Sequence, residues 1–309
     1  MQRVIITGGS GFVGRELASD LLVEGYEVVA LSRNPDAVNG LPDGVQVAQW
    51  DAATGNGWSE LADGALAIVN LASENLAGER FLPSRWTDKR KARFRNSRLR
   101  AGQAVVEAVA TAQVKPKVVI QSSGIGHYGP REDKVVTEDD PPGADFLARL
   151  TVDWENSTAA VAKLGIRHVT IRSGVVLSPD EGALKRLILP FKLFVGGPMG
   201  SGRQGFPWIH PSDEVAAIRF LLENEGARGP FNLVAPEALS FGEFGVKLAR
   251  VMGRPYWMPI PAFALRGALG EVASTVLEGQ KAAPQKLLNM GFKFAFPTAE
   301  AALRDLLKS

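Results

Sequence analysis

Glycines near the start of the chain have the spacing of a phosphate-binding turn. The run Val4–Gly14 reads VIITGGSGFVG, so glycines 9, 11 and 14 fit G-x-G-x-x-G and glycines 8, 11 and 14 fit G-x-x-G-x-x-G. Glycine permits a tight turn, close approach of the backbone to a pyrophosphate, and close packing of the next helix, whose N-terminus offers free N–H groups. We predict a dinucleotide site, rather than a plain strand–helix turn, formed by Gly8, Gly9, Ser10, Gly11, Phe12, Val13 and Gly14.

The end of the second expected strand indicates which dinucleotide binds. An NAD site usually places an acidic residue there for the ribose hydroxyls, but this chain has Arg33. A carboxylate would repel the 2′-phosphate of NADP, whereas a guanidinium can pair with it bidentately. We therefore predict NADP(H) as the cofactor, with a solvated loop position for Arg33 as the alternative. Asp51, which ends the third strand, suits adenine recognition, although a solvated turn aspartate fits equally well.

A later run rich in glycine and aromatic residues, Gly200–His210, could form the wall of a substrate pocket. In it, Arg203 could meet a phosphate or carboxylate, and Trp208 could stack on a ring. The alternative is an interdomain packing loop in which His210 caps or hydrogen-bonds the backbone. With three histidines and no cysteines in the chain, we expect no metal site.

Elements of an α/β fold can position these residues. Strands are expected at Val4–Thr7, Glu27–Leu31, Val45–Gln49, Ala67–Asn70, Val118–Ser122 and His168–Arg172. Amphipathic helices are expected between them at Gly14–Glu24, Lys91–Ala112 and Thr151–Lys163, with Gly25 ending the first. Buried β-branched strands alternating with helices predict a Rossmann-type doubly wound parallel sheet. Short helical patterns from about residue 236 onward predict a smaller, mostly C-terminal lobe.

Composition excludes several classes of protein. The 309 residues carry a net charge of +2, which gives no broad electrostatic case for nucleic acid or an anionic membrane. The basic run Lys89–Arg100 fits a solvated helix face better than a nucleic-acid site. No apolar run reaches the roughly 18 residues of a membrane span, and no signal peptide is evident. The absence of cysteine excludes disulfides, and we expect a cytoplasmic protein.

The chain resembles the atypical "epimerase family" group of the extended short-chain dehydrogenase/reductase superfamily. The resemblance spans almost the whole chain and is carried by Thr7–Gly14, Ser32–Asn34, Asn70–Leu76, Arg85-Trp86, Ser97-Arg98, Trp154-Glu155, Arg172–Leu177, Gly196–His210, Leu277–Lys281 and Gly291–Phe294. It implies an NADP(H)-binding Rossmann domain of residues 1–175 and about 209–236, with a lobe of about 176–208 and 237–309. It places near the dinucleotide Ser32, Arg33, Leu71, Ala72 and Arg98, and places Val176 beside the nicotinamide.

The superfamily's usual catalytic pair is missing. Short-chain dehydrogenases use Tyr-x-x-x-Lys on a helix, where the lysine lowers the pKa of the tyrosine. No tyrosine in this chain has a lysine four residues later. A glutamate often follows the Tyr/Lys pair on this helix. If Glu155 is aligned with that glutamate, Leu147 and Thr151 occupy the positions of the tyrosine and the lysine. The usual mechanism therefore does not carry over.

A second candidate for catalysis lies after the fifth strand, in the run 122–129. Ser123 is the closest match to the superfamily's catalytic serine, and His127 or Tyr128 could supply a proton. The alternative is that Ser123 satisfies backbone groups while the other two pack in the loop. We expect an NADP(H)-dependent oxidoreductase or epimerase-like enzyme acting on an unknown small molecule. The alternative function is an NADP(H)-sensing or scaffold protein without catalytic turnover. The sequence is also compatible with a homodimer.

Overall fold

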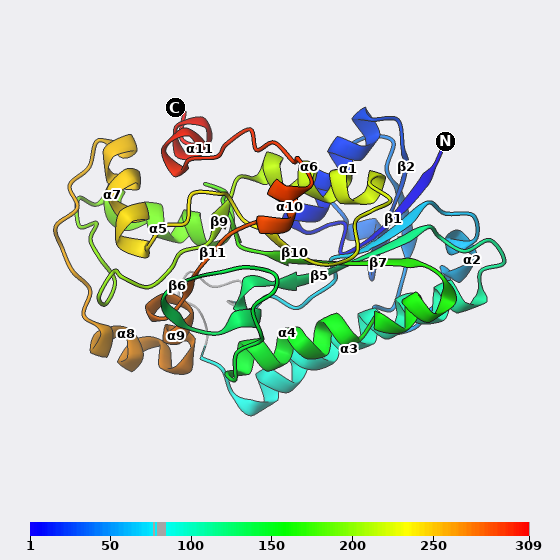
Figure 1. The fold of residues 1–309 in the computed structure, drawn as a ribbon, viewed down its shortest axis with the longest axis horizontal. Coiled ribbons are helices and arrows are strands. Elements are labelled where there is room, and N and C mark those ends of the chain that lie inside the picture. The colour runs from blue at the N-terminus through cyan, green and yellow to red at the C-terminus, as the bar shows by residue number, and fades with distance from the viewer. Residues whose placement is uncertain (77, 79–84, 309) are drawn as a thin grey trace.

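A seven-stranded parallel sheet forms the centre of the computed structural model, which describes residues 1–76, 78 and 85–308. Its strands run in the order β10-β7-β5-β4-β1-β2-β3 (Figure 1). They are β1 (Arg3–Thr7), β2 (Glu27–Ser32), β3 (Gln46–Gln49), β4 (Ala67–Asn70), β5 (Val118–Gly124), β7 (Arg167–Ser173) and β10 (Gly229–Leu233). The predicted Rossmann-type α/β fold is thus confirmed, and the six predicted strands are present. The seventh, β10, was not predicted.

Helices cover both faces of this sheet, as Figure 1 shows. On one face, α1 (Phe12–Val23) and α6 (Pro211–Glu223) lie side by side, and their apolar residues share a core with β1, β4, β5 and β7. On the other face lies α3 (Asp88–Thr111), which packs on the sheet and alongside α4 (Phe146–Asn156). Gly25 follows α1 with a φ of 82°, the left-handed conformation expected of a glycine that ends a helix.

The predicted helix Thr151–Lys163 is wrong in its extent. The α-helix α4 begins at Phe146 and ends at Asn156. Its N-cap is Asp145, whose side chain accepts a hydrogen bond from Ala148 N. A separate 3₁₀ turn, η3 (Ala159–Leu164), follows. The Ser157 hydroxyl donates to the Trp154 carbonyl at 2.6 Å, and Thr158 is held 2.9 Å from a ring nitrogen of His168. These contacts end the helix at a point that hydrophobic periodicity does not reveal.

The remaining chain forms a lobe beside the carboxyl ends of the strands. Its helices are α5 (Gly182–Lys192), α7 (Phe241–Met252), α8 (Ala262–Leu269), α9 (Ser274–Leu277) and α11 (Ala299–Leu306). Two small sheets join it: β8 (Val175–Val176) with β9 (Trp208–Ile209), and β6 (Arg131–Val136) with β11 (Gln280–Ala282). Short elements complete the chain: α2 (Ser59–Ala62), α10 (Gln285–Asn289), η1 (Pro35–Ala37), η2 (Ile125–Tyr128) and η4 (Gly270–Ala273).

Two contacts tie distant parts of the chain together. The buried carboxylate of Asp213, in the first turn of α6, accepts hydrogen bonds from Ala295 N at 2.7 Å and Phe296 N at 2.9 Å, which fixes the segment before α11. Arg15 of α1 forms an ion pair with Glu181, which precedes α5. Among the described residues, no helix has the length and apolar character needed to cross a membrane.

Candidate functional site

The predicted glycine turn joins β1 to α1, and three of its glycines are required by packing alone. Gly8 has a φ of 69°, and its carbonyl accepts a hydrogen bond from Gly11 N at 3.0 Å. A Cβ on Gly14 would lie 2.5 Å from that carbonyl oxygen, and a Cβ on Gly9 would lie 2.7 Å from Ala30 Cβ. These glycines let α1 start close against β1 and β2.

Gly11 differs from the other three. Its φ of −73° suits any residue, and an added Cβ would meet only the Gly8 carbonyl oxygen, at 3.3 Å. Gly11 is also the N-cap of α1, which has no side-chain cap and no acidic residue in its first turn. The turn therefore leaves room and unpaired N–H groups at Phe12 and Val13, which is what a pyrophosphate needs. The residues present fit a dinucleotide phosphate at this position.

The side chains at the ends of β2 and β3 differ in whether their polar atoms are already hydrogen-bonded within the protein or are free to bind a ligand. Arg33 is exposed and forms no ion pair within the described part of the chain, so its guanidinium is available to a phosphate. The Ser32 hydroxyl accepts from Asn34 N at 3.2 Å. Both Asp51 oxygens are occupied by its own turn, because they accept from Ala53 N, Thr54 N and Thr54 Oγ1, each at 2.8 Å. An adenine contact for Asp51 remains a prediction.

The chain after β4 forms the opposite border of the glycine turn. Ala72 N donates to the Thr7 hydroxyl at 3.2 Å, and a Cβ on Gly8 would lie 3.0 Å from the Leu71–Ala72 backbone. Arg98 of α3 is buried, with its guanidinium 4.6 Å from the Trp154 ring centre. Burial lowers the pKa of Arg98 to about 10.

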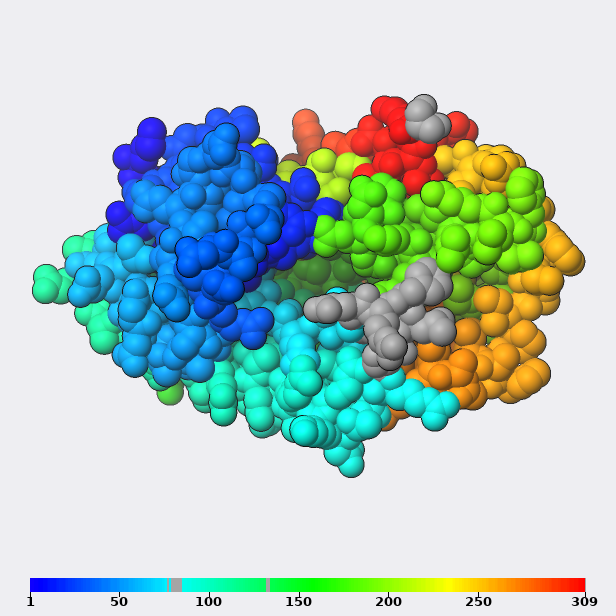
Figure 2. Space-filling model, turned by 180° about the vertical axis from the view of Figure 1, so that it is seen from behind, coloured from blue at the N-terminus to red at the C-terminus, as the bar shows by residue number. Residues whose placement is uncertain are grey.

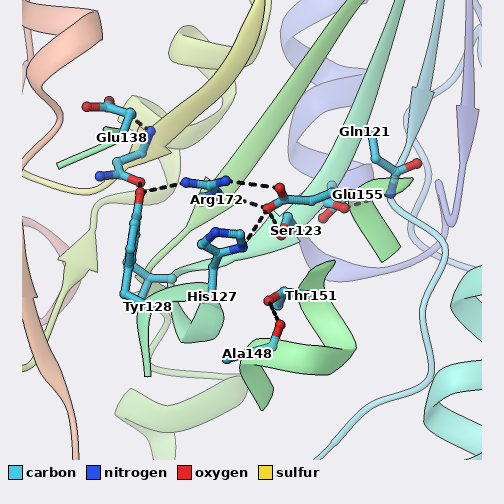
Figure 3. Close-up of polar contacts among 12 residues, drawn as sticks. Gln121, Ser123, His127, Tyr128, Glu138, Ala148, Thr151, Glu155 and Arg172 are labelled. Atoms are coloured by element: carbon cyan, nitrogen blue, oxygen red, sulfur yellow. Dashed lines mark hydrogen bonds and ion pairs between the residues drawn. The ribbon is translucent and has the colours of Figure 1, made fainter. Parts of the chain in front are cut away.

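A partly buried carboxylate organises the polar residues at the ends of β5 and β7 (Figure 3). Arg172 of β7 holds Glu155 of α4 with two hydrogen bonds, Nε to Oε1 at 2.9 Å and Nη2 to Oε2 at 3.0 Å. Ser123 Oγ donates to the same Oε1 at 2.7 Å, and His127 Nδ1 lies 3.3 Å from it. Burial alone would raise the pKa of Glu155, but the contacts with His127 and Arg172 outweigh it and lower the pKa to about 2.

The two ring nitrogens of His127 have different surroundings. Its Nδ1 is enclosed and lies 3.3 Å from Glu155 Oε1, without a well-formed hydrogen bond. Its Nε2 forms no hydrogen bond with a described residue and is not among the fully enclosed atoms that lack a partner. Nε2 is thus the less enclosed of the two nitrogens. An imidazole held by a carboxylate through one nitrogen and free at the other is a common acid–base arrangement.

Tyr128 cannot fill the proton-donor role predicted for it. Its side chain is completely buried, and its hydroxyl accepts from Arg172 Nη1 at 2.9 Å and donates to Asn232 Oδ1 at 2.7 Å. Burial raises the pKa of Tyr128 to about 12. The hydroxyl hydrogen is already used and no surface is left for a substrate, so this expectation is corrected.

The positions of the missing pair are chemically inert. A Cβ on Gly126 would lie 3.3 Å from Leu147 Cβ, so Leu147 packs against the loop that carries His127. Thr151 is buried, and its hydroxyl donates to the Ala148 carbonyl of its own helix at 2.8 Å. Neither side chain can exchange a proton with a substrate.

The structure supports the substrate residues predicted in 200–210 to different degrees. Trp208 is buried in the lobe core, and its indole N–H donates to the Glu237 carbonyl at 3.2 Å, so its predicted stacking on a ligand ring is wrong. Arg203 is exposed, and its ligand remains a prediction. His210 is the N-cap of α6, with Nδ1 accepting from Ser212 N at 3.1 Å, which is the capping alternative. Val176 lies in β8, paired with Ile209.

Sequence reasoning missed three charged residues of this region. Glu155 and Arg172 were noted only as parts of family motifs. Their spacing in the sequence does not indicate the ion pair that they form between α4 and β7. Glu214 of α6 was not singled out at all. It is buried, one oxygen accepts from Ser173 Oγ at 2.6 Å, and the other has no partner. Burial raises the pKa of Glu214 to about 8. In the described residues, no group of three or more His, Asp or Glu could hold a metal ion.

Figure 2 shows the surface hollowed between the N-terminal chain, in blue, and the green segment that includes α5. The glycine turn and the His127 loop both follow the carboxyl ends of parallel strands, which is where open α/β sheets bind ligands. Residues 4–233 match the NAD dependent epimerase/dehydratase family, and this chain belongs to that family. Residues 260–306 match a domain of unknown function, DUF1731.

Relatives of similar length carry the same organisation. The epimerase family protein YfhF of Bacillus subtilis is 37% identical over 98% of this chain and 97% of its own length. The mouse epimerase family protein SDR39U1 is 35% identical over 99% of both chains. The crystal structure of human epimerase family protein SDR39U1 (isoform 2) with NADPH superposes with a TM-score of 0.86, at 33% identity and 99% coverage of both chains. The resemblance read from the sequence is confirmed.

Proposed function

We propose that this protein is an NADP(H)-dependent oxidoreductase or epimerase-like enzyme that acts on an alcohol or carbonyl group of a small molecule. The observation that carries the proposal is an open, glycine-lined turn on the same sheet edge as an imidazole with one free nitrogen. NADPH in the structure of the human relative supports the choice of dinucleotide, as does Arg33, which has no ion-pair partner among the described residues.

The dinucleotide would be held by backbone and by Arg33. The N–H groups at the start of α1 would bind the pyrophosphate, and the Arg33 guanidinium would bind the 2′-phosphate. Backbone after β4 and Arg98 of α3 would border the nicotinamide half. When bound, the nicotinamide gives or accepts a hydride.

The chain's own chemistry is proton transfer at His127 Nε2. This atom would accept a proton from a substrate alcohol or, in the imidazolium form, return one to a carbonyl oxygen. Glu155, kept ionised by Arg172, would hold the imidazole with its hydrogen on Nδ1 and stabilise the imidazolium. Ser123, whose hydroxyl hydrogen points to Glu155, would offer its oxygen lone pairs to the reacting group.

The test follows NADPH oxidation against a panel of aldehydes, ketones and sugar nucleotides. Because the tyrosine–lysine pair is absent, we expect poor or no turnover of common sugar nucleotides. For any substrate that reacts, His127→Asn should lower kcat about a hundredfold to ten-thousandfold, since an acid–base group is lost. His210→Asn is the matched control, because asparagine retains the capping of α6. A fast reaction that His127→Asn leaves unchanged would exclude this site.

A non-catalytic NADP(H) sensor is the second candidate. It is favoured by the inert residues Leu147 and Thr151 and by the commitment of the Ser123 hydrogen to Glu155. Tight NADPH binding without turnover of any panel member would support it.

A further inference from the structure

The hydrogen bonds around Glu155 continue through Arg172 to Asn232 on the neighbouring edge strand β10, as Figure 3 shows in part. Arg172 Nη1 donates to the Tyr128 hydroxyl at 2.9 Å, and that hydroxyl donates to Asn232 Oδ1 at 2.7 Å. Asn232 Nδ2 donates in turn to the carbonyl of Ala283, at 2.9 Å. A single chain of contacts thus leads from the segment before α10 to the carboxylate that faces His127.

The direction of each bond in this chain is forced by the one before it. Arginine only donates, so the Tyr128 oxygen must accept from Nη1 and its hydrogen must go to Asn232. Asn232 therefore presents its oxygen to Tyr128 and its amide nitrogen to Ala283. Reversing any link would set two donors or two acceptors against each other.

Burial leaves this chain no substitute partners. Tyr128 and Asn232 are completely enclosed, and Arg172 is nearly so. The backbone of Asn232 is also fixed, because its N–H donates to Glu138 Oε1 at 3.0 Å, and the same oxygen accepts from Lys286 N at 3.2 Å. Loss of one link therefore leaves a buried polar group without a partner, which the neighbouring groups must move to relieve.

We propose that Tyr128 and Asn232 are positioning residues for the acid–base pair. They hold Arg172 at its outer nitrogen, Arg172 fixes both oxygens of Glu155, and Glu155 keeps His127 with its Nδ1 toward the carboxylate. The imidazole of His127 is then kept in one orientation. The inference rests on the proposed function only for the catalytic use of His127.

The test reads the tautomer of His127 directly. The chain has three histidines, so nitrogen-15 labelling of histidine gives a resolvable NMR spectrum. In the wild type we expect His127 to show one tautomer, with hydrogen on Nδ1. Tyr128→Phe should move its two ring-nitrogen shifts toward each other, as should Glu155→Gln. The double variant should show no change beyond that of Glu155→Gln alone, because both act through one chain.

Tyr26→Phe is the matched control, since the Tyr26 hydroxyl bonds Glu223 at the opposite edge of the sheet. Asn232→Ala tests the next link while keeping Tyr128, in case Tyr128→Phe does not fold. Either variant, Tyr128→Phe or Asn232→Ala, could lower the melting temperature but leave the His127 tautomer unchanged. That result would show a merely structural role and overturn the proposal. A tautomer change in a protein without any turnover would leave the positioning role in place and overturn only the proposed enzyme.

Discussion

The glycine turn and the surroundings of Glu155 both lie at the carboxyl edge of the same sheet, but they prepare for a ligand in opposite ways. Around the glycine turn, function depends on what is left open: Gly11 has no side chain that would block a phosphate, and Arg33 forms no ion pair with any described carboxylate. Around Glu155, the carboxylate is held by Arg172 and Ser123, and His127 Nδ1 is enclosed 3.3 Å from it. A site that must admit a large anion keeps its groups unpaired, whereas a site that must hold one proton in place encloses all but the atom that transfers it.

Breaking the open region should have the largest effect. Gly11→Val should reduce NADPH affinity at least a hundredfold, because the branched side chain would occupy the space of the pyrophosphate. The fold should survive, since Gly11 has an ordinary φ. Gly14→Val is the contrasting variant and should unfold the turn, because its Cβ would lie 2.5 Å from the Gly8 carbonyl oxygen. Fluorescence titration with NADPH and thermal unfolding check both; normal binding by Gly11→Val would place the phosphates elsewhere.

Breaking the enclosed region should affect stability more than binding. Arg172→Met leaves Glu155 buried without its cation and should lower the free energy of unfolding by about 3–5 kcal/mol. Arg250→Met, which breaks the exposed pair with Glu300, should cost less than about 1 kcal/mol. Because Glu155 titrates near 2 when folded and near 4.5 when unfolded, its contribution is complete above about pH 4.5 and lost as the pH falls toward 2. Urea unfolding at several pH values measures both effects; equal losses in the two variants would contradict the assignment.

Glu214 sharpens the comparison, because it is more deeply buried than Glu155 and forms no ion pair with a described residue. Its pKa is about 8 when folded against 4.5 when unfolded, so the folded state holds a proton that the unfolded state releases. Stability should therefore fall by roughly 3–4 kcal/mol between pH 5 and pH 8 from this group alone. Glu214→Gln keeps an acceptor for Ser173 and removes that loss. Stability curves for the wild type and Glu214→Gln that run parallel across this range would refute the interpretation.

Arg33 should have the smallest effect of the four and a selective one. Charge-assisted hydrogen bonds are each worth roughly 1.5–3 kcal/mol, so Arg33→Ala should weaken NADP(H) binding about tenfold to a few hundredfold. NAD(H) affinity should change little, because that dinucleotide lacks the 2′-phosphate. Calorimetric titration with both dinucleotides checks this, and equal affinities in the wild type would remove Arg33 from the site.

The glycine turn could be predicted from the sequence better than the contacts around Glu155, because local signals mark the first and tertiary contacts make up the second. Glycine spacing and buried β-branched strands are local signals, and β1, β2, β4 and β5 appear within one or two residues of expectation. The Glu155–Arg172 pair is a tertiary contact between a helix and a strand, and no periodicity encodes it. Trp208 was misassigned because an aromatic residue in a glycine-rich run looks the same whether it stacks on a ligand or fills a core.

The position of β10 in the chain has a consequence for folding. This strand pairs in parallel with β7, Gly229 beside Val169, only after the chain has built α5, β9 and α6. During synthesis, β7 is therefore an unpaired edge until residue 233 has left the ribosome. An edge of Val169 and Ile171 exposed for that interval is a template for pairing with another nascent chain. The same parallel crossover that completes the sheet is a non-local pairing, which is a slow kind of contact to form.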